Sequence, residues 1–169
     1  MREALTLALL LAVATVAHSG AATARDALAL GTAKLSLVIP NENWQIIEER
    51  RKPDDTAVYY ALASAKRDLV FSFFLDNATS CRTAAACRDR ALANPAFREG
   101  RHLLLLERGQ FSVPEFSLET TMQQPVRQIH LLAEAIVNGY AVDIHLSRMG
   151  AVAPDAAPFY EFLKVVSFE

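Results

Sequence analysis

The strongest constraint on the fold is a pair of strand-like runs that meet at Asn138-Gly139. The dipeptide Asn-Gly favours the two-residue type I′ turn, because both residues tolerate the positive φ that this turn requires. A turn of this length fixes the register of the strands on either side, so that Val137 lies opposite Tyr140. The sequence therefore predicts an antiparallel hairpin over residues 126–147.

The two faces of this hairpin differ in character, because side chains alternate between the two sides of a strand. One face is apolar and is the predicted core: Ile129, Leu131, Ala133, Ala135, Val137, Tyr140, Val142, Ile144 and Leu146. The other face carries most of the polar groups: His130, Leu132, Glu134, Asp143, His145 and Ser147. The predicted register places Glu134 opposite Asp143, so two carboxylates that should repel each other are brought together.

The polar face can be interpreted as a ligand site. Glu134, Asp143 and His145 offer two carboxylates and an imidazole within a span suited to one divalent cation. With His130 and Ser147 beside them, they define a candidate binding face. A divalent metal is the cofactor that these residues would take.

The same face can also be interpreted as the ordinary polar side of a hairpin. The like charges of the two carboxylates would then be balanced by His145 or by an arginine such as Arg127 or Arg148. We favour this interpretation, since a histidine outside an established motif is more often structural. Covalent catalysis by Ser147 is favoured least, because no helix N-terminus or backbone nest stands behind it to hold an oxyanion.

Apart from this hairpin, the chain is a series of strands interrupted by two helices. Strands are expected at residues 35–39, 44–48, 56–63, 69–75 and 111–121, and helices at 82–93 and 159–164, with a last strand at 165–168 that returns to the sheet. Residues 102–107 (HLLLLE) are consistent with a helix or with a buried strand, since so short an apolar run has no decisive periodicity. Pro114 favours a sheet edge for its strand, because proline cannot donate a backbone hydrogen bond.

The N-terminal segment predicts export. Ala4 to Ala17 is an apolar run of 14 residues, shorter than the ~20 residues that span a bilayer. Ala22-Thr23-Ala24 then provides small residues at the positions that a signal peptidase reads. We therefore expect a signal peptide over residues 1–24, a single globular domain over residues 25–169, no transmembrane anchor after cleavage, and a periplasmic or secreted protein.

Export changes the interpretation of the two cysteines, Cys81 and Cys87, because thiols pair in oxidising compartments. In one continuous helix these positions would differ in rise by about 9 Å, which exceeds the Cα separation that a disulfide tolerates. One cysteine must therefore lie outside the helix, and the turn-like residues before Cys81 place the helix start there, with Thr79 or Ser80 as its cap. A loop this short is stabilised by about 2 kcal/mol, which indicates a structural cross-link rather than a redox centre.

Charge narrows the choice of partner. The 17 basic and 19 acidic residues give a net charge of −2, without the excess of positive charge that binding to a phosphate backbone requires. Nucleic acid is therefore not expected as a partner. Residues 82–101 are locally basic, with a net charge of +3. This segment is interpreted as a solvated helix face, and the alternative is a patch for an acidic partner or for anionic lipid heads.

The order of these elements resembles the PsbP/Mog1/DcrB-like group. The resemblance is carried by a strand that ends at Pro40 and resumes at Trp44, the strands TAVYYALA and LVFSFFL, a helix, a long meander, and a terminal helix that runs into FLKVVSFE. The loop PNENW departs from the tighter proline, glycine, tryptophan turn of the group. The resemblance implies an α+β fold in which helices flank an antiparallel sheet as an α/β/α sandwich. It also implies a scaffold that binds other proteins or supports an envelope assembly.

The absence of common catalytic motifs from the sequence bears on its function. There is no glycine-rich phosphate loop, no G-x-S-x-G, no H-E-x-x-H and no C-x-x-C. We expect an exported, soluble binding or accessory protein of the bacterial cell envelope, without catalytic activity of its own, whose partner is another envelope protein. The alternative is a small metal-dependent hydrolase that uses Glu134, Asp143 and His145.

Overall fold

A computed structural model describes residues 27–30, 35–39, 43–54, 56–66, 69–78, 81–97, 99–121, 125–150 and 155–169. The predicted signal peptide, residues 1–24, lies outside the described residues. So do Pro40 and the residues Thr79 and Ser80.

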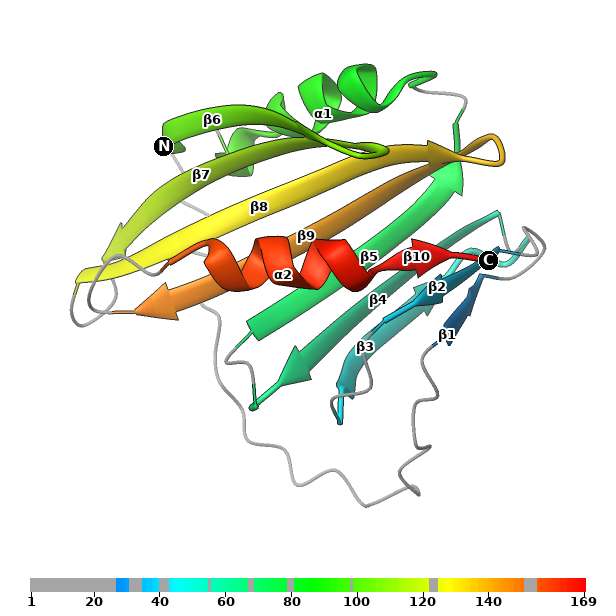
Figure 1. The fold of residues 1–169 in the computed structure, drawn as a ribbon, viewed down its shortest axis with the longest axis horizontal. Coiled ribbons are helices and arrows are strands. Elements are labelled where there is room, and N and C mark those ends of the chain that lie inside the picture. The colour runs from blue at the N-terminus through cyan, green and yellow to red at the C-terminus, as the bar shows by residue number, and fades with distance from the viewer. Residues whose placement is uncertain are drawn as a thin grey trace, which may run out of the picture.

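The fold is built on a seven-stranded antiparallel sheet (Figure 1). Its strands, in spatial order, are β3 (Gln45–Arg51), β4 (Ala57–Ser64), β5 (Leu69–Asn77), β9 (Tyr140–Gly150), β8 (Pro125–Val137), β7 (Phe111–Thr121) and β6 (Arg101–Arg108). Chain neighbours mostly pair, because short turns connect antiparallel strands. The exception is the β5–β9 pair, which joins the first hairpins of the chain to the last one.

The predicted hairpin register is confirmed. Val137 pairs with Tyr140 and Glu134 pairs with Asp143, while His130 pairs with Ser147. The turn residues Asn138 and Gly139 both have positive φ, at 50° and 81°. This is the backbone conformation that the type I′ turn requires, so the local chemistry of two residues sets the register of the two longest neighbouring strands.

A second, three-stranded sheet lies beside the C-terminal helix. It contains β1 (Ala27–Leu30), β2 (Leu35–Val38) and β10 (Ser167–Phe168), with β2 in the centre. The expected last strand therefore forms, but it joins this small sheet instead of the large one. Strand β1 has no counterpart in the sequence prediction.

The main core fills the space between the small sheet, helix α2 (Ala157–Val165) and one face of the large sheet. Phe159 and Phe162 of α2 are fully buried there. Phe162 contacts the rings of Trp44 and Phe71, with centroids 5.6 and 5.0 Å away. Residues with even numbers in β9, such as Val142, face this core, as the period of two predicts.

Helix α1 (Ala84–Leu92) lies on the opposite face of the large sheet, against β7 and β8. Cys81 precedes the helix and Cys87 lies within it, and their sulfur atoms are at disulfide distance, as predicted. Both cysteines pack with Ala141, the neighbour of Val142 that points to the other face. The cap is Thr83, whose hydroxyl accepts a hydrogen bond from the backbone N–H of Ala86 at 3.1 Å, so the prediction of Thr79 or Ser80 as the cap was wrong.

Two further expectations are resolved at the other edge of the sheet. Residues 102–107 belong to strand β6, which settles the choice between helix and strand. Strand β6 also pairs with the outer side of β7, so β7 is an inner strand and the expectation that Pro114 marks a sheet edge was wrong. The β7–β8 register passes from the Ser112–Glu134 pair to the Glu115–Leu131 pair, and Pro114 lies between them. The chain is thus an α+β protein, mainly antiparallel sheet with two helices in the described residues.

Candidate functional site

The polar face of the β8–β9 hairpin is covered rather than solvated. Helix α1 contacts β8, and the 3₁₀ turn η2 (Pro95–Phe97) follows it across the same face. The ring of Phe97 meets His145 edge-on, with centroids 5.7 Å apart. Of the predicted site residues, His130 is 7% exposed and Glu134 is 2% exposed. The cross-link between Cys81 and Cys87 ties the residues before α1 to its first turn, and so helps to hold this cover in place.

The two histidines form a hydrogen-bonded pair beneath this cover. Nδ1 of His130 lies 2.9 Å from Nε2 of His145, and Nε2 of His130 lies 2.9 Å from Oε1 of Gln128. Since Gln128 Oε1 can only accept, His130 carries its proton on Nε2 and accepts at Nδ1 from His145. Phe116 stacks on the His130 ring, with a centroid distance of 5.3 Å.

Burial lowers the pKa of both imidazoles. The pKa of His130 falls to about 4 because the ring is removed from water. The pKa of His145 falls to about 3, first through burial and then through the charge that His130 would carry when protonated. Both rings are therefore neutral near pH 7, and a neutral ring can donate from one nitrogen and accept at the other.

The two carboxyl groups form the second pair. Burial raises the pKa of Glu134, and the charge of Asp143 raises it further. Burial also raises the pKa of Asp143, whose Oδ1 is buried without a hydrogen-bond partner. Two opposed carboxyls of this kind do not both ionise near neutral pH, because ionising both would place like charges side by side.

The cation that acts on this pair comes from helix α1. Arg90 lowers the pKa of both carboxyls, in opposition to burial. A second arginine of α1, Arg88, donates a hydrogen bond from Nη1 to Ser112 Oγ at 3.0 Å. The balancing arginine is thus Arg90, and the expectation of Arg127 or Arg148 was wrong. The described part of the basic segment 82–101 is mostly exposed, in agreement with its interpretation as a solvated helix face: Arg82, Arg90 and Arg101 are exposed and Arg88 is partly buried.

This arrangement separates the residues of the predicted metal set. Glu134 and Asp143 belong to the carboxyl pair, whereas His145 is bonded to His130. Within the parts of the chain that the structure describes, no three His, Cys, Asp or Glu side chains are placed to hold a metal ion. The fifth predicted residue, Ser147, lines a separate cavity of about 370 Å³ with Val70 and Met149.

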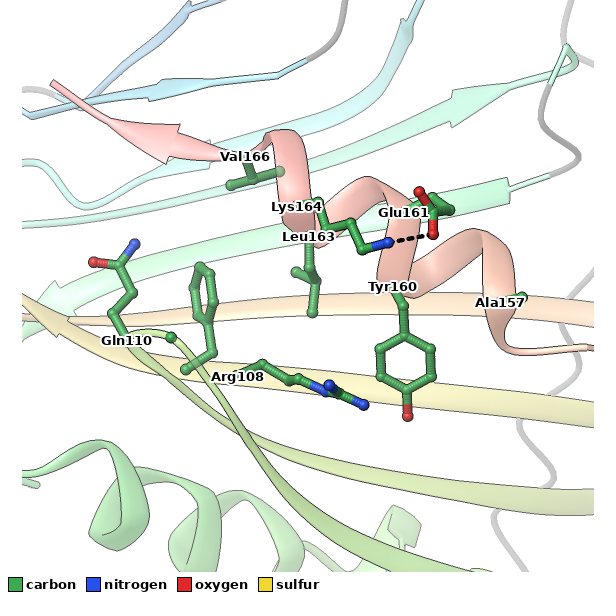
Figure 2. Close-up of a pocket in the computed structure, with 10 residues that line it drawn as sticks. Arg108, Gln110, Ala157, Tyr160, Glu161, Leu163, Lys164 and Val166 are labelled. Atoms are coloured by element: carbon green, nitrogen blue, oxygen red, sulfur yellow. Dashed lines mark hydrogen bonds and ion pairs between the residues drawn. The ribbon is translucent and has the colours of Figure 1, made fainter.

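Two surface features were not recognised in the sequence. The first is a cavity of about 760 Å³ between α2 and the β6–β7 turn, called here the α2 cavity. Its apolar lining comes from Phe111, Leu163 and Val166. Figure 2 shows the side chain of Arg108 extending below the helix toward Tyr160. The guanidinium lies 5.3 Å from the centroid of that ring.

The second feature is the outer strand β6. Leu103, Leu104 and Leu105 are 49%, 52% and 52% exposed. Strand β3, at the other edge, also exposes Ile46 and Ile47, but charged residues follow them, and its arginines pair with neighbouring glutamates, Arg50 with Glu48 and Arg51 with Glu49. Charged side chains protect a sheet edge from pairing with other chains, and an apolar edge lacks that protection.

Comparison with known proteins supports the fold alone. No protein-family model matches the chain, and no curated protein matches it. A crystal structure of a protein from Bacteroides thetaiotaomicron is similar, with a TM-score of 0.54 and 10% sequence identity. The match covers 83% of this chain and 47% of the other, so this chain spans about half the length of that protein.

No helix in the described ranges is long and apolar enough to cross a membrane. The paired cysteines are typical of a protein from an oxidising compartment, since thiols stay reduced in the cytosol.

Proposed function

We propose that this chain is an exported, soluble accessory protein of the bacterial cell envelope, which binds another envelope protein at the β6 edge and has no catalytic activity of its own. The observation that carries this proposal is the row of half-exposed leucines on an outer strand. An envelope protein with an extended apolar segment can add to such an edge as a further strand.

The positions of the leucines favour a strand over other kinds of partner. Leu104 lies opposite Glu115, which accepts a hydrogen bond from Tyr160 of α2, so Leu104 points to the α2 face of the sheet. Leu105 points to the opposite face, since side chains alternate. A helix laid on one face would cover only one of these leucines. An added strand would take up the free backbone groups and lie beside both.

The absence of catalysis is supported by the state of the polar face. The groups that resemble catalytic residues, the carboxyl pair and the imidazole pair, lie beneath α1 and η2 and interact with each other. A general acid or base must come within hydrogen-bond reach of its substrate, and these groups are kept from it.

We also propose that the protein is exported from the cytosol and that its fold is of the PsbP/Mog1/DcrB-like kind. The disulfide between Cys81 and Cys87 supports the periplasm or the cell exterior, in agreement with the predicted signal peptide. The PsbP/Mog1/DcrB-like α/β/α sandwich is supported by the two helices, which contact opposite faces of one antiparallel sheet.

Co-purification from the native envelope tests the binding function. We expect a specific protein to accompany the wild-type chain and to be lost from Leu105→Lys, because a charge on the edge opposes strand addition. The matched control is Ile47→Lys, at a 62% exposed position of the opposite edge strand β3, which should keep the partner. A partner retained by Leu105→Lys, or lost equally from both variants, would contradict the proposal.

A further inference from the structure

We propose that the α2 cavity binds an organic anion with an apolar chain, such as a fatty-acid carboxylate, through Arg108. This inference goes beyond the binding of a protein at β6, and the isolated chain is sufficient to test it.

The cavity has the size and lining of a small-molecule site. Its volume of about 760 Å³ falls within the ~300–1,000 Å³ that is typical of such sites. Phe111, Leu163 and Val166 form an apolar base, while the exposed side chains of Gln110 and Lys164 stand at its rim. An apolar base with a few polar groups around it fits a ligand that has a chain at one end and a charge at the other.

Arg108 is the cation at the rim that forms no ion pair among the described residues, because the nearby charged groups have other partners. Lys164 is neutralised by Glu161, with Nζ and Oε1 2.6 Å apart. Glu115 accepts a hydrogen bond from the hydroxyl of Tyr160. The described residues provide no carboxylate partner for Arg108.

The stacking of Arg108 also prepares it to bind an anion. Its guanidinium lies over the Tyr160 ring, 5.3 Å from the centroid, at a distance where the ring attracts the cation and limits its movement. The N–H donors lie in the plane of the guanidinium and stay available, which suits the two oxygens of a carboxylate. Burial and the bond to Glu115 raise the pKa of Tyr160, which keeps the hydroxyl protonated as a donor.

A similar arrangement elsewhere in the molecule provides a matched control. Arg50 lies over Tyr59, with its guanidinium 5.8 Å from the ring centroid, beside a cavity of about 510 Å³. There, however, the arginine is paired with Glu48. The two sites share the arginine–tyrosine stack and differ in whether the arginine is already neutralised.

The test measures binding of dodecanoate, dodecanol and acetate to the purified protein by calorimetry, below the micelle concentration. We expect dodecanoate to bind about tenfold more tightly than dodecanol, since a hydrogen bond to a charged group contributes about that ratio or more. Acetate should bind far more weakly, because it lacks the chain. In Arg108→Met the preference for dodecanoate should disappear, whereas Arg50→Met should retain it.

Each other outcome overturns the proposal. Equal binding of dodecanoate and dodecanol by the wild type would show that the site does not recognise the carboxylate. An equal loss in Arg108→Met and Arg50→Met would mean that general surface charge attracts the ligand. No binding of dodecanoate at all would leave the cavity without the proposed ligand, while the partner test at β6 would be unaffected.

Discussion

Replacing His130 with glutamine should make the protein less sensitive to mild acid. Burial lowers the pKa of His130 from 6.5 to about 4, so the folded state favours the neutral ring. As the pH falls from about 6.5 toward about 4, the ring takes up a proton in the unfolded state but stays neutral in the folded state. The free energy of unfolding therefore falls over this pH range. At about 1.4 kcal/mol for each pKa unit, the loss amounts to about 3 kcal/mol when complete and about 2 kcal/mol by about pH 4.5.

Urea unfolding at about pH 7 and about pH 4.5 measures this effect directly. Each variant is compared with itself at the two pH values, so any loss of packing in His130→Gln that does not depend on pH cancels. The carboxyl pair changes in the opposite direction over this range and is present in both proteins. We expect the fall in the free energy of unfolding to be about 2 kcal/mol smaller in His130→Gln than in the wild type. An equal fall in the two proteins would refute the conclusion that His130 is buried in its neutral form.

Further predictions concern the rest of the polar face and its surroundings. Replacing both Cys81 and Cys87 with serine should lower the free energy of unfolding by about 2 kcal/mol in urea, and an unchanged midpoint would mean that the cross-link does not support α1. Glu134→Gln should gain stability relative to the wild type as the pH rises from about 4.5 toward about 9, since a raised carboxyl pKa makes the wild type lose stability over that range; parallel pH curves would contradict this. Gly139→Ala should cost about 1 kcal/mol in thermal unfolding because of its φ of 81°, and no loss would argue against the type I′ turn. Dialysis against a chelator should leave the melting temperature unchanged, whereas a clear drop would favour the metal-dependent hydrolase.

The parts of the fold set by local chemistry could be predicted from the sequence. Asn138-Gly139 determines its own turn, and the turn determines the pairing of Glu134 with Asp143. The spacing of Cys81 and Cys87 similarly excludes a continuous helix between them, which the structure confirms. In each case the information lies within a few residues along the chain.

The cover on the polar face could not be predicted in the same way. It depends on where α1 docks after the loop from β5, which is a matter of tertiary packing. One signal was present: Arg90 follows Cys87 by three positions, so both lie on the same side of the helix. Because Cys87 is fully buried, that side faces the sheet, and Arg90, although exposed, is close enough to the carboxyls to lower their pKa.

The position of β6 at the edge of the sheet also could not be predicted from the sequence. Its run of four leucines gave no periodicity, and a fully buried strand would have the same composition. Only the order of strands in the sheet shows that β6 is an edge and that its leucines are exposed. The sequence contained the apolar run without indicating that it forms a surface.

Site-specific photo-cross-linking in the native envelope tests the central claim most directly. A photoreactive amino acid is placed at Leu105 on β6 and, as the control, at Ile47 on β3; both positions are about half exposed or more in the isolated protein. The account predicts that illumination joins position 105, and not position 47, to a different envelope protein. A cross-link only to a second copy of this chain, or no cross-link from position 105, would contradict it.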